Sequence, residues 1–179
     1  MTPAQRGVAL GMAGGLGVAL ALTLWCVAGS PGLVLSIHAV STGRRWALAI
    51  TAWLGPLLTL TVAIGVVANR RFFSAQDIDG AGLTAESHGL RVPRAVLTNT
   101  LEQATLAVPV YTGLALLLPA NQLVYPLLLS AAFVVGRIAF AAGYAKGAAA
   151  RSLGFTLTFY PTVAGLVVVA LAAVRRLLG

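Results

Sequence analysis

The sequence predicts an all-α integral membrane protein that crosses the bilayer several times. Of its 179 residues, 59% are hydrophobic and only 9% are charged, a composition far outside that of soluble domains. Its apolar stretches are long enough to cross a hydrocarbon core of ~30 Å. Since they lack the alternation of barrel strands, they are expected to form helices, which satisfy their own backbone groups in lipid.

Five apolar stretches have the length of a membrane span. They cover residues 7–28, 46–68, 95–118, 123–143 and 155–174. In the first, Gly7, Gly11 and Gly15 recur every four residues, a spacing that favours close packing against another helix. A cleavable signal peptide is the alternative for this stretch, because Arg6 precedes it and small residues surround Ala28.

The basic residues lie in ones and twos at the ends of the apolar stretches, which is typical of topology signals rather than of a nucleic-acid surface. Despite the net charge of +8, we therefore expect no nucleic-acid partner. On the side of the N-terminus lie Arg6, Arg70, Arg71, Arg91, Arg94, Lys146 and Arg151; on the other lie Arg44, Arg45, Arg175 and Arg176. This bias places the N-terminus in the cytoplasm and the C-terminus outside, in what we expect to be a bacterial inner membrane.

A five-span topology brings most of the polar residues to one face of the membrane, where the second and fourth spans end and the third and fifth begin. These residues are Arg70, Arg71, Thr98, Asn99, Thr100, Glu102, Gln103, Arg137, Tyr144, Lys146 and Arg151. The connection at residues 119–122 on the opposite face carries no charge. The concentration predicts a functional site near the cytoplasmic face.

Glu102 is a carboxylate inside an apolar span, and leaving it unpaired there costs about 2.5–3.5 kcal/mol or more. It follows Asn99 by three residues and shares its helix face. We expect Glu102 to face the bundle interior and to meet a cation or a ligand amine. A pair with Arg137 that only fixes helix packing is the alternative. Because several arginines converge on few acids, the surplus cations favour an anionic ligand.

Arg137, Tyr144 and Arg151 are separated by seven residues each. Seven residues of α-helix drift by only about 20°. The three side chains therefore form one stripe if the fourth helix continues that far, and one stripe can meet one ligand.

Together these residues resemble the MAPEG family, the membrane-associated proteins in eicosanoid and glutathione metabolism. The similarity lies in the run from Arg94 to Glu102, in Gly136-Arg137, and in Gly143-Tyr144-Ala145-Lys146 with Arg151 further on. It extends over about residues 46–174. It implies a four-helix membrane domain at residues 46–179, preceded at residues 1–45 by an additional transmembrane helix and a loop.

The resemblance implies a membrane-bound glutathione transferase or peroxidase of the microsomal type, acting on small hydrophobic electrophiles. It also implies a homotrimer that holds glutathione, as co-substrate, between subunits. We expect no metal, since the single cysteine, Cys26, excludes a cysteine metal cluster. By position, Arg71 would be the catalytic residue that stabilises the thiolate, and Glu102 would receive the γ-glutamyl amine. The other implied ligand-binding residues are Arg70, Asn99, Arg137, Tyr144 and Arg151.

Two positions depart from the family pattern. Arg94 stands five residues before Asn99 instead of four, and Phe140 stands where leukotriene-forming members have a tyrosine. A phenylalanine has no hydroxyl to donate, so the departures concern the substrate more than the fold. The alternative function is a non-catalytic member whose polar cluster serves helix packing. A small transporter is disfavoured because the sequence shows no inverted repeat.

Overall fold

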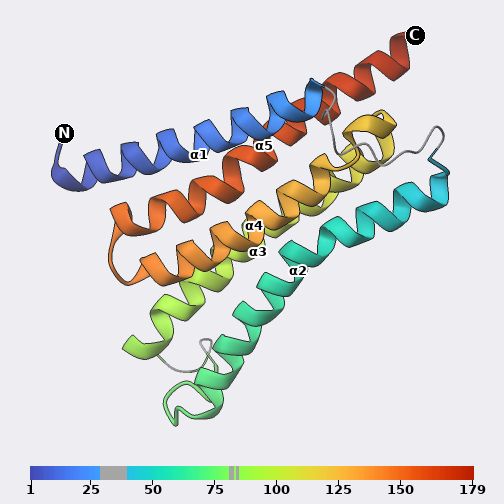
Figure 1. The fold of residues 1–179 in the computed structure, drawn as a ribbon. Helices are drawn as coiled ribbons and strands as arrows, with labels where there is room; N and C mark the ends of the chain where they lie inside the picture. The colour runs from blue at the N-terminus through green and yellow to red at the C-terminus, as the bar shows by residue number, and fades with distance from the viewer. Residues whose placement is uncertain (29–39, 81–82, 84) are drawn as a thin grey trace.

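The computed structural model describes residues 1–28, 40–80, 83 and 85–179. Its elements are α1 (Pro3–Val27), α2 (Thr42–Phe72), α3 (His88–Leu117), the 3-10 turn η1 (Ala120–Gln122), α4 (Tyr125–Tyr144) and α5 (Ala148–Leu178). Long helices that follow one another in the sequence run in opposite directions, and the neighbours α1 and α5 run in the same direction (Figure 1). The described residues contain no strand, so the all-α prediction is confirmed.

Several helices extend beyond the apolar stretches that predicted them. α3 begins at His88, seven residues before the predicted start, and α5 begins at Ala148 rather than at Phe155. Hydropathy marks only the part of a helix that suits lipid, whereas the backbone hydrogen bonds continue into polar turns. The predicted helices were therefore right in number and order, and their bounds were too short.

Four helical segments in the described part of the chain are long and apolar enough to cross a membrane. They are Pro3–Val27, Thr42–Phe72, Ala120–Tyr144 and Ala148–Leu178. α3 has the length, with 30 residues, but its charged and polar side chains lower its hydropathy. It lies instead against its neighbours, with Tyr111 and Leu114 almost fully buried. The chain is thus a multi-pass integral membrane protein.

α1 lies along α5, α5 along α4, and α2 against α3 and α4. The seam between α1 and α5 depends on glycine, because a Cβ at Gly7, Gly11 or Gly15 would collide with Ala149, Ser152 or Thr156, respectively. Thr156 Oγ1 also donates a hydrogen bond of 2.8 Å to the Gly11 carbonyl oxygen. The close packing predicted from the glycine spacing is confirmed.

Candidate functional site

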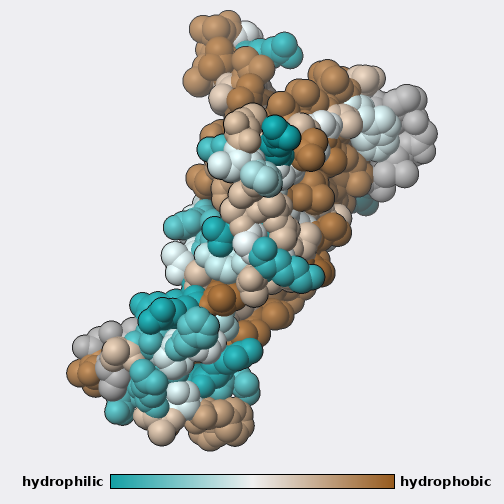
Figure 2. All heavy atoms as spheres, turned by 90° about the vertical axis from the view of Figure 1, so that its left-hand side faces the viewer, coloured by the Kyte–Doolittle hydropathy of each residue, from teal (hydrophilic) through white to brown (hydrophobic). Residues whose placement is uncertain are grey.

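One end of the bundle collects the starts of α1, α3 and α5 and the ends of α2 and α4 (Figure 1). Figure 2 views this end of the molecule. Hydrophilic residues gather at its lower part, around the connection between α2 and α3, and extend into the middle, while much of the remaining surface is hydrophobic. The predicted meeting of the helix ends is therefore confirmed, whereas Glu102, at the centre of α3, lies nearer the middle of the bundle.

A series of hydrogen bonds links α4 to α3 between this end and the middle of the bundle. Arg137 Nη1 donates to Asn99 Oδ1 at 2.8 Å, and Asn99 Nδ2 donates to Glu102 Oε2 at 3.2 Å. Only 4% of Arg137 is exposed, and its guanidinium carbon lies 4.2 Å from the centre of the Phe140 ring. Arg137 Nε and Nη2 are buried and have no hydrogen-bond partner. The amide of Asn99 thus separates the cation from the carboxylate.

Glu102 itself is exposed on the single chain, so the expectation that it faces the interior of one bundle is wrong. The reason is its helix position. The neighbouring Gln103 is buried, as are Ala104 and Ala107, and a residue one step before Gln103 points about 100° away from it. A direct pair between Glu102 and Arg137 is also absent: in the described ranges the ion pair is Arg94 with Glu86, at 3.4 Å.

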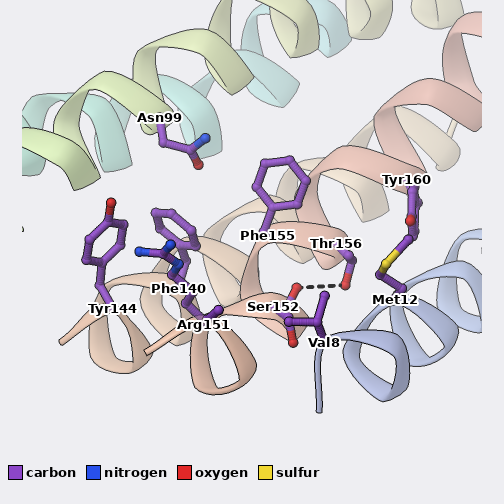
Figure 3. A pocket seen from close by; sticks show the side chains of 11 residues that line it. Val8, Met12, Asn99, Phe140, Tyr144, Arg151, Ser152, Phe155, Thr156 and Tyr160 are labelled. Carbon is purple, nitrogen blue, oxygen red and sulfur yellow. Dashed lines mark hydrogen bonds between the residues drawn. The ribbon is translucent and has the colours of Figure 1, made fainter. Parts of the chain in front are cut away.

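A cavity of about 410 Å³ lies beside the hydrogen bonds of Asn99, between α1, α3, α4 and α5. It is lined by Val8, Met12, Asn99, Phe140, Tyr144, Ala148, Arg151, Ser152, Phe155, Thr156 and Tyr160. Figure 3 shows Asn99 and Tyr144 toward one end and Met12 and Tyr160 toward the other, with Phe155 between them. The volume lies within the range of about 300–1,000 Å³ that small-molecule sites occupy.

Tyr144 and Arg151 meet at the polar end of this cavity, where the Arg151 guanidinium carbon lies 4.2 Å from the centre of the Tyr144 ring. They do not lie on one helix, so the predicted stripe is wrong. α4 ends at Tyr144, and Gly147, with φ of 103°, turns the chain into α5. Antiparallel packing brings the two residues together instead, and a Cβ at Gly143 would collide with Ala150 of α5.

The remaining predicted residues lie apart from this cavity in the single chain. Arg137 contacts two residues that line it, Asn99 and Phe140, and itself lines a second, mostly apolar cavity of about 570 Å³ between α2, α3 and α4. Arg70 lines a third, of about 270 Å³, with Asp77. Arg71 is partly buried at the end of α2, and its Nε has no hydrogen-bond partner. One chain therefore assembles Asn99, Tyr144 and Arg151, but not the arginine pair of α2.

A comparison with protein families matches residues 46–171 of the chain to the MAPEG family. The chain belongs to the MAPEG family. The match begins in α2 and ends in α5, so α1 lies outside it. Searches of the curated proteins and of the solved structures gave no match to this MAPEG chain.

The cavity residues of this MAPEG protein that were not predicted from the sequence include Val8 and Met12. Each directly follows a glycine of the α1 seam, Gly7 or Gly11. A residue one step from the centre of a packed helix face lies about 100° around the helix, at the edge of the contact. The glycine spacing could therefore have identified both positions once the partner helix was known.

Proposed function

We propose that this MAPEG protein binds glutathione and transfers it to small hydrophobic electrophiles dissolved in the bilayer, or uses it to reduce lipid peroxides. The observation that carries the proposal is the cavity of about 410 Å³, whose polar end combines Asn99, Tyr144 and Arg151 from three helices. These are residues in which the sequence resembles the family.

The charges around the polar end suit the parts of glutathione. Its two carboxylates need cationic or hydroxyl donors, and Arg151 and Tyr144 offer both. Its amino group needs a carboxylate. Glu102 is hydrogen-bonded through one oxygen to Asn99 and has its other oxygen available for that role.

The reactive species would be the glutathione thiolate, which attacks an electrophilic carbon to form a C–S bond while the leaving group departs with its electron pair. Lowering a thiol pKa from about 8.5 to about 6 requires about 3.4 kcal/mol of thiolate stabilisation. We assign this role to Arg71, because a charge-assisted hydrogen bond in a poorly hydrated site can supply it.

Arg71 lies outside the cavity of its own chain, and Glu102 is exposed on α3, which packs against the membrane-spanning helices α2, α4 and α5. Both placements support a homotrimer in which each site combines residues of two subunits, since an exposed carboxylate in lipid needs a covering partner. Native mass spectrometry in mild detergent should then give a trimer. A monomer alone would contradict the shared site.

The direct test is to titrate detergent-solubilised protein with glutathione while following thermal stability and thiolate absorbance. A ligand that binds only the folded form raises the melting temperature with its concentration, and a thiolate band should appear near neutral pH. If wild-type protein shows neither effect, the enzymatic proposal fails, and the polar cluster serves helix packing in a non-catalytic member.

Two variants separate binding from activation. Arg71→Ala should leave glutathione-dependent stabilisation measurable but remove the thiolate band. Glu102→Gln should weaken binding itself by about 1.5–3 kcal/mol, the range for a hydrogen bond to a charged group. Arg176→Ala, at the opposite end of α5, is the matched control and should change neither signal.

A further inference from the structure

The cavity of about 410 Å³ has an apolar end as well as a polar one. At the apolar end, the cavity is lined by Met12 of α1 and Tyr160 of α5, and Val8 and Phe155 lie between this end and the polar one (Figure 3). Together these side chains offer a polarisable thioether and two aromatic rings.

α1 lines one side of the cavity, and it lies outside the segment that matches the MAPEG family. Val8 and Met12 are the cavity residues that precede the matched segment, which begins at residue 46, and the other lining residues lie within it. Without α1, this side of α5 would be open. The described structure therefore gives the cavity a boundary that the four-helix part does not contain.

The side of the cavity that α1 lines is held in a fixed position. Gly7 and Gly11, which directly precede Val8 and Met12, contact α5 so closely that neither has room for a Cβ. Thr156 bonds to the Gly11 carbonyl oxygen at 2.8 Å. Because the α1 backbone cannot move closer to α5, a change of side chain at residue 12 alters the space in the cavity rather than the seam.

We propose that α1 forms one wall of the space that holds the electrophile, which we call the acceptor wall. We further propose that Met12 in this wall limits the size of the electrophile, which is a compact aromatic molecule. The proposal rests on the proposed function in taking the polar end as the thiol site. Thioether and aromatic side chains make favourable contacts with aromatic rings. The volume is near the lower end of the range for ligand sites, so a bound thiol leaves room for a compact acceptor only.

The test compares Met12→Ala and Met12→Trp with wild type, using chlorodinitrobenzene and the larger chlorodinitronaphthalene as electrophiles. Met12→Trp should lower kcat/KM for the naphthalene relative to the benzene by about tenfold or more, and Met12→Ala should shift the ratio the other way. The KM for glutathione should stay unchanged in both variants. Leu10→Ala and Leu10→Trp, at a position 75% exposed on α1, are the matched controls.

A second readout does not depend on the reaction. Unreactive dinitronaphthalene should raise the melting temperature of wild type and of Met12→Ala, and not that of Met12→Trp. If glutathione stabilises the protein while neither the substrate ratio nor this stabilisation responds to residue 12, the acceptor wall is refuted and the proposed function stands. If dinitronaphthalene discriminates the variants but glutathione has no effect, the wall stands and the proposed function fails.

Discussion

The amide of Asn99 is the side chain that organises the polar cluster. An arginine only donates hydrogen bonds and a carboxylate only accepts them, whereas an asparagine does both. Asn99 can therefore satisfy Arg137 with its oxygen and Glu102 with its nitrogen at the same time. A hydrophobic residue could satisfy neither, and an aspartate would repel Glu102.

Replacing Asn99 by Leu should lower the stability of the folded protein by about 1.5–3 kcal/mol, because buried Arg137 loses its hydrogen bond. Thermal unfolding in mild detergent measures the change. Thr98→Leu, at the exposed neighbouring position, is the control and should differ little from wild type. Equal melting temperatures for the two variants would mean that the bond from Arg137 to Asn99 contributes nothing to stability.

The connection between α2 and α3 is held by Asp77, of which only 3% is exposed. The Ser74 hydroxyl donates to its carboxylate at 2.6 Å, and the Ser87 amide donates at 2.9 Å. These bonds from Ser74 and Ser87, aided by the charge of Arg71, hold the pKa of the Asp77 carboxyl below its usual value of 3.8.

The lowered pKa predicts the pH dependence of this connection. The contribution of the carboxylate is fully present above pH 3.8 and is lost as the pH falls through the lower pKa of the folded state. The Ser87 amide should therefore lose its protection from hydrogen exchange in strong acid, so that its exchange rate approaches the intrinsic rate of an unprotected amide. Asp77→Asn should show fast exchange already at neutral pH, and Asp79→Asn, at an exposed position, should behave as wild type. Slow exchange in Asp77→Asn would contradict this.

At the scale of helices, the seam between α1 and α5 depends on residues without side chains. A Cβ at Gly15 would collide with Thr156, including its backbone carbonyl carbon at 2.8 Å, whereas a Cβ at Gly17 would meet nothing within 4 Å. Gly15→Ala should therefore destabilise the protein by about 1–3 kcal/mol, as overpacking does, and Gly17→Ala should be tolerated. Thermal unfolding of this matched pair checks the difference, which vanishes if α1 does not lie on α5.

The sequence predicts helices well here because hydropathy and length decide what can cross a bilayer. It predicts contacts between helices less well. The predicted stripe of Arg137, Tyr144 and Arg151 is wrong because α4 ends at Tyr144 and the chain turns before α5, although Tyr144 and Arg151 still meet across the turn. Met12 was missed because its partners are more than a hundred residues away in the chain, and no local pattern records such a contact.

At the scale of the whole molecule, each long helix of the described residues runs opposite to the one before it in the sequence, which places the N-terminus and the C-terminus at opposite ends (Figure 1). We expect the N-terminus and the connection after α2 to lie in the cytoplasm and the C-terminus to lie outside, because more basic residues lie at the end of the bundle that holds the N-terminus. Reporter fusions after Gly179 and in the connection between α2 and α3 test this. Two reporters on the same side of the membrane would contradict the five-span topology. A cytoplasmic reporter after Gly179 together with an external one between α2 and α3 would contradict only the orientation.

The unusual polarity of α3 has a consequence for biogenesis. With Glu102 near its middle, α3 has the composition of a helix that the insertion machinery retains poorly by itself, since each charge at such a position opposes insertion by about 2.5–3.5 kcal/mol. α4 follows after a short connection at residues 118–124 and carries Arg137, which bonds to Asn99. We therefore expect α3 and α4 to enter the bilayer together as a hairpin, each helix shielding the polar group of the other.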